Sequence, residues 1–183
     1  MYKNIYFIGI GGIGMSAIAR YFITSNAKGF AVSGYDKTPS PLTEALESEG
    51  IDVHYTDDAS YIPKDVDKTL VVYTPAIPKD MGELVYAQEH GYRVIKRSKM
   101  LGEIATGQRC MAVAGTHGKT TTTSLIYYML KNAGLNVGLA GNIGQSYAYQ
   151  VATEQHDIYV LELSSFQLDN VYDFKADIAI ITN

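Results

Sequence analysis

Two glycine-rich loops in the sequence have the composition of phosphate-binding loops. In the first, Gly9-Ile10-Gly11-Gly12-Ile13-Gly14 satisfies the pattern G-x-G-x-x-G between an apolar run and an amphipathic segment. Glycines at these positions permit a tight turn and let backbone N–H groups approach a diphosphate at a helix N-terminus. Asp36 follows roughly 20 residues later, where a carboxylate can accept a hydrogen bond from a ribose. The pattern fits an NAD-type site, and it also fits a tight turn without a ligand.

The second loop is a departure from the standard phosphate-binding loop. The segment Ala114 to Thr121 contains Gly118-Lys119-Thr120, but Val113 stands where the strict pattern G-x-x-x-x-G-K-[ST] requires glycine. Backbone amides of such a loop surround phosphate oxygens, the lysine reaches the β- and γ-phosphates, and the threonine hydroxyl can bind Mg²⁺. A lysine at a glycine turn followed by consecutive threonines has little structural reason to exist. His117 could contact the nucleotide or hold the shape of the loop.

Apolar runs alternate with helical patterns around the first loop, which predicts a parallel sheet flanked by helices. We expect a five-stranded Rossmann-like domain over residues 1–107. Its strands are predicted at residues 5–8, 31–33, 51–53, 70–73 and 93–95. Helices are predicted at residues 13–24, 41–49, 82–90 and 97–105, the second of them opened by Pro39 and Pro41 and stopped by Gly50.

A second strand–helix series begins at residue 108. Strands are expected at residues 110–114, 136–139, 158–161 and 178–181, with helices at 118–133 and 146–153. A domain with its own P-loop usually needs more elements than these, so residues 108–183 are interpreted as an incomplete P-loop α/β domain. Both glycine loops then join the carboxyl end of a strand to the N-terminus of a helix, where ligands bind in such folds.

The composition limits the classes of partner. The net charge is −4, which disfavours a nucleic-acid-binding surface, and no apolar stretch reaches the roughly 18–20 residues that span a bilayer. Cys110 is the only cysteine and lies in an apolar run, so it is interpreted as a buried strand residue. His54, His90 and His156 are interpreted as isolated surface or edge residues without metal-ligand spacing. We expect a cytoplasmic protein with no nucleic-acid or membrane partner.

The two loops together resemble those of the Mur ligases, the ATP-dependent enzymes that build the peptide of bacterial cell-wall precursors. Residues 1 to about 123 are similar to the L-alanine-adding (MurC) branch. The similarity is carried by the segments Phe7 to Ser16, Ser33 to Asp36, Tyr73 to Pro78, Lys96-Arg97 before Met100-Leu101, and Ala114 to Thr121.

The rest of the chain, from about residue 124 to residue 183, resembles a different branch, the D-glutamate-adding (MurD) enzymes. The similarity lies in Gly141-Asn142-Ile143-Gly144 and in Leu161 to Asp169. The alanine-adding branch would show a more acidic segment where Glu162 to Ser165 stand. The sequence therefore predicts a truncated or chimeric chain, whether a natural hybrid, a recombination product or an assembled chimera.

The resemblance implies the ligands and the site residues. ATP would be bound by Gly115, Thr116, His117, Gly118, Lys119, Thr120 and Thr121. Lys119 and Glu162 would be catalytic, and Thr120 and Glu162 would bind Mg²⁺, although Glu162 also fits an ordinary acid at a strand end. UDP-N-acetylmuramic acid or its L-alanyl derivative would be bound by Gly11, Gly12, Ile13, Gly14, Asp36, Thr74, Pro75, Asn142 and Ser164.

The implied reaction joins an amino acid, L-alanine by the resemblance to the first branch, to the UDP-sugar through an acyl phosphate. D-Glutamate addition is the alternative within the family. A nicotinamide-dependent oxidoreductase would explain only the first loop, and a non-catalytic nucleotide-binding module would explain both. The 183-residue chain is expected to bind ligands but hardly to turn over.

Overall fold

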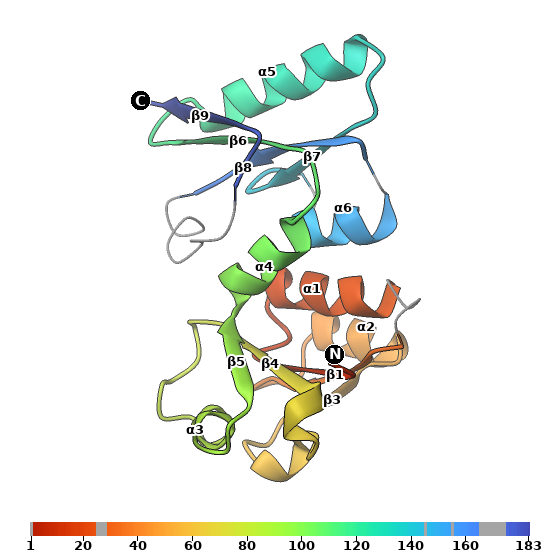
Figure 1. The fold of residues 1–183 in the computed structure, drawn as a ribbon, viewed down its shortest axis with the longest axis vertical. Helices are drawn as coiled ribbons and strands as arrows, with labels where there is room; N and C mark the ends of the chain where they lie inside the picture. The colour runs from red at the N-terminus through yellow and green to blue at the C-terminus, as the bar shows by residue number, and fades with distance from the viewer. Residues whose placement is uncertain (1, 25–28, 145, 155, 165–174) are drawn as a thin grey trace. The chain divides into compact units, whose positions relative to one another are not determined.

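The computed structural model describes residues 2–24, 29–144, 146–154, 156–164 and 175–183, without the side chains of residues 152 and 153. The chain divides into two compact units, Met1–Met100 and Leu101–Asn183 (Figure 1). Each unit contains its own parallel sheet. This confirms the predicted fold class of a five-stranded parallel α/β domain followed by a second parallel α/β sheet. The domain boundary at residue 107 stays a prediction.

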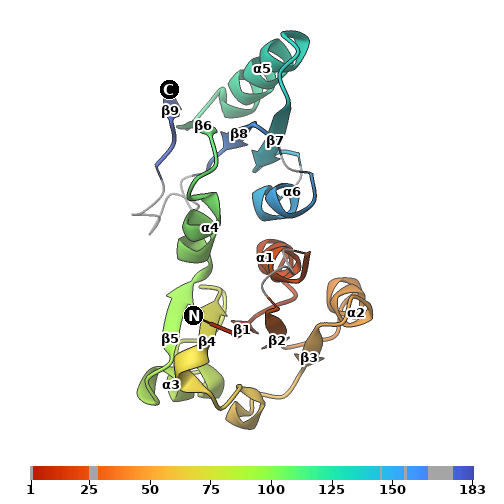
Figure 2. The same cartoon turned by 45° about the vertical axis from the view of Figure 1, so that its right-hand side comes forward.

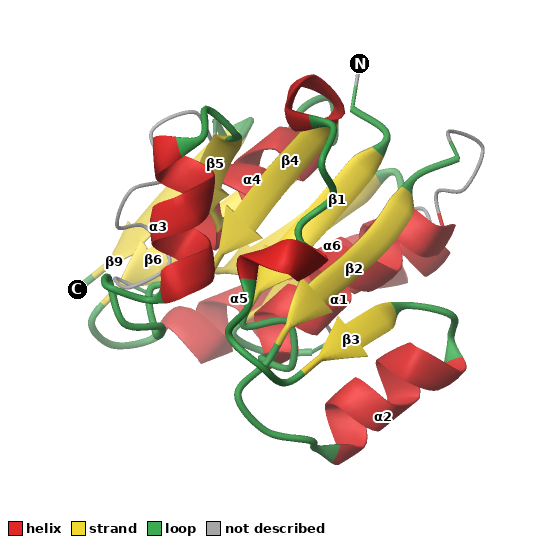
Figure 3. Ribbon diagram, turned by 90° about the horizontal axis from the view of Figure 1, so that it is seen from below, coloured by secondary structure: helices red, strands yellow, loops and turns green. Residues whose placement is uncertain are grey.

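The first unit is a doubly wound sheet with the strand order β3-β2-β1-β4-β5. All neighbouring strands pair in parallel. The strands are β1 (Asn4–Ile8), β2 (Ala31–Tyr35), β3 (Asp52–His54), β4 (Thr69–Tyr73) and β5 (Arg93–Lys96). Helices α1 (Ile13–Thr24) and α2 (Pro41–Ser48) cover one face, and α3 (Gly82–Glu89) covers the other (Figures 1 and 3). Helix α4 (Arg97–Ala105) follows β5.

The central strands are apolar because they are covered on both faces. Ile5 to Ile8 of β1 and Leu70 to Val72 of β4 are all at most 3% exposed. Strands β2 and β3 lie on one side of β1, whereas β4 and β5 lie on the other. The order in which successive strands are added to the sheet therefore reverses between β1 and β4. The crevice at the carboxyl ends of β1 and β4 is therefore the place where such a fold binds ligands. The first glycine loop follows β1 directly.

The second unit is a four-stranded parallel sheet with the order β7-β8-β6-β9. Its strands are β6 (Cys110–Gly115), β7 (Val137–Gly141), β8 (Ile158–Glu162) and β9 (Ile178–Thr182). Helices α5 (Lys119–Asn132) and α6 (Tyr147–Thr153) lie on opposite faces of this sheet (Figure 2). Cys110 is 1% exposed and its Sγ lies 3.3 Å from the Tyr147 hydroxyl, which confirms the buried strand cysteine.

Two short elements were missed by the sequence patterns. They are the 3-10 turns Ala59–Tyr61 and Val66–Lys68, which connect β3 to β4. The first is capped by Asp58, whose side chain accepts a hydrogen bond from the Ser60 backbone N–H at 2.8 Å. Such single turns have no apolar period that a sequence could display. None of the described helices is long and apolar enough to cross a bilayer.

Candidate functional site

The first glycine loop is held against the ends of two strands. The backbone N–H groups of Gly9 and Ile10 both donate to the Tyr35 carbonyl, at 2.8 and 2.9 Å. Gly9 has φ +85°, and a Cβ at this position would approach the Thr74 Cγ2 atom at 2.6 Å. Both the backbone conformation and the close approach of Thr74 therefore require glycine.

Asp36 anchors the same loop. Its Oδ2 atom accepts a 2.6 Å hydrogen bond from the Gly11 N–H, and a Cβ on Gly11 would lie 2.8 Å from Oδ2 and from Thr43 Cγ2. A hydrogen bond from a backbone N–H to a carboxylate is charge-assisted and shorter than an ordinary amide bond. One oxygen of Asp36 is thus committed to the loop. The predicted contact of Asp36 with a ribose remains untested.

A cation lies at the start of α1, where the loop ends. The Arg97 guanidinium fills the space that a Cβ on Gly14 would occupy. Ile13, the first residue of the helix, is 78% exposed. In the sequence, Arg97 is recognisable only as part of the Lys96-Arg97 motif. Nothing in the local pattern indicates that the side chain of residue 97 lies against residue 14. A helix N-terminus and a guanidinium both favour an anion.

A cavity of about 680 Å³ opens beside this loop in the first unit. Its lining residues are Gly9, Gly12, Tyr35, Asp36, Lys37, Asp57, Thr74, Ala76, Ile77, Pro78, Asp80 and Met81. Of the predicted substrate residues, Gly12, Asp36 and Thr74 line it, whereas Pro75 is the exposed residue that follows Thr74. Asp57 was missed because it belongs to no motif. Its carboxylate caps α3, accepting from the N–H groups of Gly82 and Glu83 at 2.9 Å each.

A buried polar cluster of Tyr6, His54 and Glu83 lies next to Asp57 and α3, and it corrects the interpretation of His54. The Tyr6 hydroxyl donates to Glu83 Oε2 at 2.7 Å and lies 2.6 Å from His54 Nε2. The His54 side chain is only 11% exposed and stacks on Tyr61, so His54 is not isolated. Burial raises the pKa of Glu83, which is fully buried, to about 7. Burial also lowers the pKa of His54 and raises that of Tyr6.

The other two histidines differ from each other. His90 is exposed and stacks on Tyr86 with ring centroids 3.8 Å apart. His156 is not isolated, because its ring nitrogens lie 2.7 Å from Asn136 Oδ1 and 3.1 Å from Glu154 Oε2.

In the second unit the P-loop joins β6 to α5. Gly118 has φ +78° and precedes the first helical residue, and Gly115 has φ +133°. A Cβ on Gly115 would overlap the Thr182 carbonyl oxygen. Val113, which replaces the first glycine of the strict pattern, is a fully buried strand residue paired with Glu162 on β8 and Ile180 on β9. The glycine is dispensable there because the chain is still extended at residue 113.

The predicted ATP-binding residues run from the end of β6 through the loop into the first turn of α5. Lys119 donates from Nζ to the Thr116 carbonyl at 2.9 Å, so the lysine side chain folds back over the loop. Among these residues, Gly115 and Lys119 are half-buried, and the others are exposed: Thr116, His117, Gly118, Thr120 and Thr121. The predicted Mg²⁺ residue Thr120 belongs to the first turn of α5.

Glu162 lies at the carboxyl end of β8, next to the strand that leads into the P-loop. It is 2% exposed, and its Oε1 atom accepts from Asn142 Nδ2 at 3.1 Å. Its Oε2 atom has no hydrogen-bond partner among the described residues. A buried carboxylate oxygen without a partner is costly, and a cation would satisfy it. The fold thus places Asn142, a predicted substrate residue, beside Glu162, the predicted Mg²⁺ ligand.

The described residues contain no group of three or more His, Cys, Asp or Glu side chains that could hold a metal. Mg²⁺ usually binds one or two protein carboxylates and takes its other ligands from phosphate and water, so the single Glu162 fits it. Ser164, the other predicted substrate residue of this unit, is half-buried two residues beyond β8. Residues 165–169 of the segment used for the D-glutamate resemblance lie outside the described residues.

Comparison with known proteins decides the family. The model of the "Mur ligase family, catalytic domain" matches residues 4–109, and that of the "Mur ligase middle domain" matches residues 113–183. The chain belongs to the Mur ligase family. It is 48% identical over 186 aligned residues to a UDP-N-acetylmuramate–L-alanine ligase of Porphyromonas gingivalis, covering 99% of the chain and 40% of that relative. The chain thus spans well under half the length of this Mur ligase.

Two solved Mur ligase structures are similar to the whole chain. One is the UDP-N-acetylmuramate:L-alanyl-γ-D-glutamyl-meso-diaminopimelate ligase from Neisseria meningitides, with a TM-score of 0.70 and 27% identity over 100% of the chain and 61% of that structure. The other is the UDP-N-acetylmuramate-alanine ligase MurC from Thermotoga maritima, with a TM-score of 0.67 and 27% identity over 98% of the chain and 41% of that structure.

These matches do not support a chimera. The Porphyromonas alanine ligase aligns with 99% of the chain, including the part after residue 124 where a change to the D-glutamate-adding branch was predicted. The motifs behind that prediction are short, and short motifs recur among members of one family.

Proposed function

We propose that the chain supplies the UDP-sugar-binding and ATP-binding parts of an ATP-dependent ligase that joins L-alanine to UDP-N-acetylmuramic acid. The observation that carries the proposal is the buried Glu162, whose Oε2 atom lacks a partner among the described residues, on the strand adjacent to a lysine-bearing P-loop. The choice of L-alanine rests on the 48% identity to an alanine ligase.

The second unit is proposed to bind ATP and Mg²⁺. Backbone N–H groups of the loop from Gly115 to Thr121 would surround the phosphates, and Lys119 would leave the Thr116 carbonyl to meet them. Thr120 and Glu162 would hold Mg²⁺, which offsets negative charge on the transferring phosphoryl group when bound. Glu162 is already oriented for this by Asn142.

The first unit is proposed to bind the UDP moiety. The N-terminus of α1 and Arg97 favour the diphosphate, while the cavity beside the loop has carboxylates at Asp36, Asp57 and Asp80 against one cation at Lys37. Acidic walls repel phosphate but can accept hydrogen bonds from ribose hydroxyls and a base N–H. We therefore assign the cavity to the nucleoside and the loop to the diphosphate. Calorimetry with UDP-N-acetylmuramic acid and with NAD tests this, and tighter binding of NAD would refute it.

The proposed reaction has two steps. The carboxylate of the sugar substrate attacks the γ-phosphorus of ATP, so that an acyl phosphate forms and ADP leaves. The amino group of L-alanine then attacks the acyl carbon, an amide bond forms, and inorganic phosphate leaves with a proton lost from nitrogen. The residues of this chain position the phosphates and offset their charge, which is the main requirement of phosphoryl transfer.

The decisive experiment changes Lys119 in a protein of the full length of its relatives. Lys119→Ala should reduce phosphate release with L-alanine by about 100-fold or more and leave the affinity for UDP-N-acetylmuramic acid unchanged. Lys175→Ala, at an exposed lysine of the same unit, is the matched control and should leave both unchanged. Phosphate release by Lys119→Ala at the normal rate would refute the ATP site. Faster release with D-glutamate than with L-alanine would refute the amino-acid assignment.

A further inference from the structure

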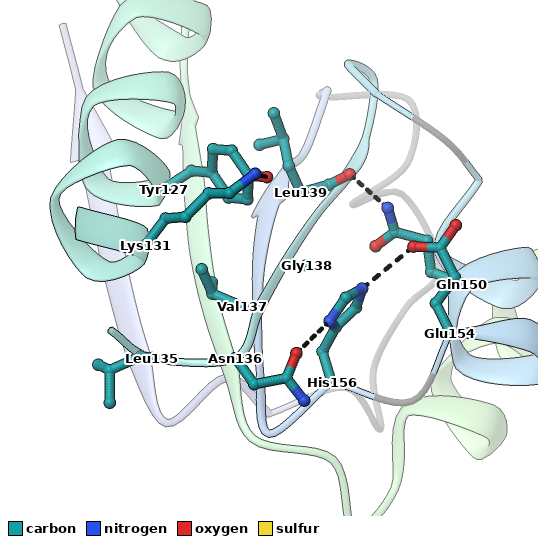
Figure 4. Close-up of a pocket in the computed structure, with 10 residues that line it drawn as sticks. All are labelled: Tyr127, Lys131, Leu135, Asn136, Val137, Gly138, Leu139, Gln150, Glu154 and His156. Atoms are coloured by element: carbon teal, nitrogen blue, oxygen red, sulfur yellow. Dashed lines mark hydrogen bonds and ion pairs between the residues drawn. The ribbon is translucent and has the colours of Figure 1, made fainter. Parts of the chain in front are cut away.

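A polar hollow of about 450 Å³ lies beside the edge strand of the second sheet (Figure 4). Its floor is the first half of the edge strand β7, residues 137–139, and the P-loop lies at the carboxyl ends of the strands. Tyr127 and Lys131 reach it from α5 on one side, and Gln150 and Glu154 come from the α6 side (Figure 4). The hollow is therefore separate from the proposed ATP site.

Gln150 gives this hollow an unused acceptor. The residue is 6% exposed, and its Nε2 atom donates to the Leu139 carbonyl at 2.9 Å. Its Oε1 atom has no hydrogen-bond partner among the described residues and points into the hollow (Figure 4). A Cβ on Gly138 would lie 2.7 Å from this atom and 2.5 Å from His156 Cδ2, so a side chain at position 138 would displace Gln150 and His156. A buried acceptor in this position calls for a donor from a bound molecule.

The charged side chains of the hollow are of both signs and lie on different elements. Lys131 Nζ lies 3.0 Å from the Tyr127 hydroxyl and 5.2 Å from the centroid of its ring. Glu154 Oε2 lies 3.1 Å from His156 Nε2. One lysine and one glutamate give a formally neutral hollow when His156 is neutral, which disfavours nucleotides and polyamines. Leu135 and Val137 add apolar surface to the same lining.

We propose that this hollow binds a small zwitterion, a free α-amino acid with a short apolar side chain. The ammonium group donates to Gln150 Oε1 and lies near Glu154, the carboxylate is bound by Lys131, and the side chain packs on Leu135 and Val137. Charge-assisted hydrogen bonds of this kind are stronger than neutral ones and give orientation. The proposal is independent of the ligase assignment, because it uses none of the residues of the ATP or UDP sites.

The probe is L-valine, titrated into the isotope-labelled 183-residue chain and followed by the backbone amide signals of residues 136–139, 150 and 154. Saturable shifts at these residues in the range of about 1–10 mM are expected. The matched probes are 2-hydroxy-3-methylbutyrate, which lacks the ammonium group, and isobutylamine, which lacks the carboxylate. Each should bind about tenfold more weakly, since one charge-assisted hydrogen bond is lost.

Two variants locate the contacts. Lys131→Met changes an exposed side chain and should weaken L-valine binding about tenfold, as should Gln150→Met. Lys175→Met is the matched control and should bind L-valine as the unchanged chain does. The proposal is overturned if L-valine causes no saturable shift, because the hollow would then hold only water. It is equally overturned if both matched probes bind as well as L-valine, or if Lys131→Met keeps full affinity.

Discussion

Replacing Glu83 with glutamine should change how the stability of the first unit depends on pH. Glu83 is fully buried in the first turn of α3, where its oxygens accept from the Tyr6 hydroxyl at 2.7 Å and from the Asp58 N–H at 3.2 Å. Burial raises its pKa from 4.5 to about 7. Glutamine keeps the size and an acceptor oxygen but cannot ionise.

The direction follows from the raised pKa. A folded-state pKa above the unfolded value means that the stability from protonated Glu83 is fully present below pH 4.5 and is lost as pH rises through about 7. The difference of 7 − 4.5, or 2.5 pKa units, corresponds to at most about 3 kcal/mol. Between about pH 5 and about pH 8 the wild-type unit should lose about 2 kcal/mol relative to Glu83→Gln.

His54 titrates in the opposite sense and must not be confused with Glu83. Burial lowers the pKa of His54, so its contribution is lost as pH falls below the ordinary value of 6.5. His54 and the neighbouring carboxylates of Asp52, Asp57 and Asp58 are present in both proteins. His54 Nε2 lies 3.6 Å from Glu83 Oε1, so the comparison of wild type with Glu83→Gln measures Glu83 together with its contact to His54.

The assay is urea unfolding at about pH 5 and about pH 8, followed by the NMR signals of β1 and β4 amides so that only the first unit is observed. Glu89→Gln, at an exposed residue of the same helix, is the matched control and should show the same pH dependence as wild type. A stability difference between wild type and Glu83→Gln that is equal at the two pH values would refute the reasoning.

Three further outcomes follow from the two glycine loops and the strand end. Gly11→Ala should weaken the binding of UDP-N-acetylmuramic acid at least about tenfold, because the new Cβ would lie 2.8 Å from Asp36 Oδ2. Calorimetry measures this affinity, with ATP affinity as the internal control, and an unchanged affinity for the UDP-sugar would contradict the prediction. In a full-length ligase, Glu162→Gln should raise the Mg²⁺ concentration for half-maximal phosphate release about tenfold, because the substitution removes the negative charge of the carboxylate whose Oε2 atom has no partner among the described residues. An unchanged dependence on Mg²⁺ concentration would exclude Glu162 as a ligand. The 183-residue chain spans 40% of its alanine-ligase relative, and it should release no phosphate from ATP with L-alanine or D-glutamate. Measurable turnover would show that these 183 residues are sufficient for catalysis.

The short motifs predicted the family but misled about its branch. Gly141 to Gly144 and the segment around Glu162 suggested a change of branch, yet the alanine ligase of Porphyromonas gingivalis aligns with 99% of the chain. Such loops are constrained by phosphate, metal and turn geometry that related ligases share, so they discriminate poorly among them. Identity spread along the whole chain carries the finer information.

The sequence alone determined the features that depend on neighbours in the chain. Alternation of apolar runs and helical periods predicted both parallel sheets, and glycine spacing placed a loop after β1 and another after β6. Strands, helices and tight turns are selected by local sterics and by burial of one face, so residues close in sequence are sufficient to indicate them.

Contacts between side chains far apart in the sequence depend on how the strands are ordered in the sheet. Tyr6 and Glu83 are 77 residues apart, and Arg97 returns to Gly14, because β1 is central in its sheet and the chain crosses that sheet repeatedly. Strand order and register set these meetings, and a one-residue slip would turn each side chain to the other face. No local pattern contains that information, which is why the buried polar cluster around Glu83 and the hollow beside Gln150 are visible only in the folded chain.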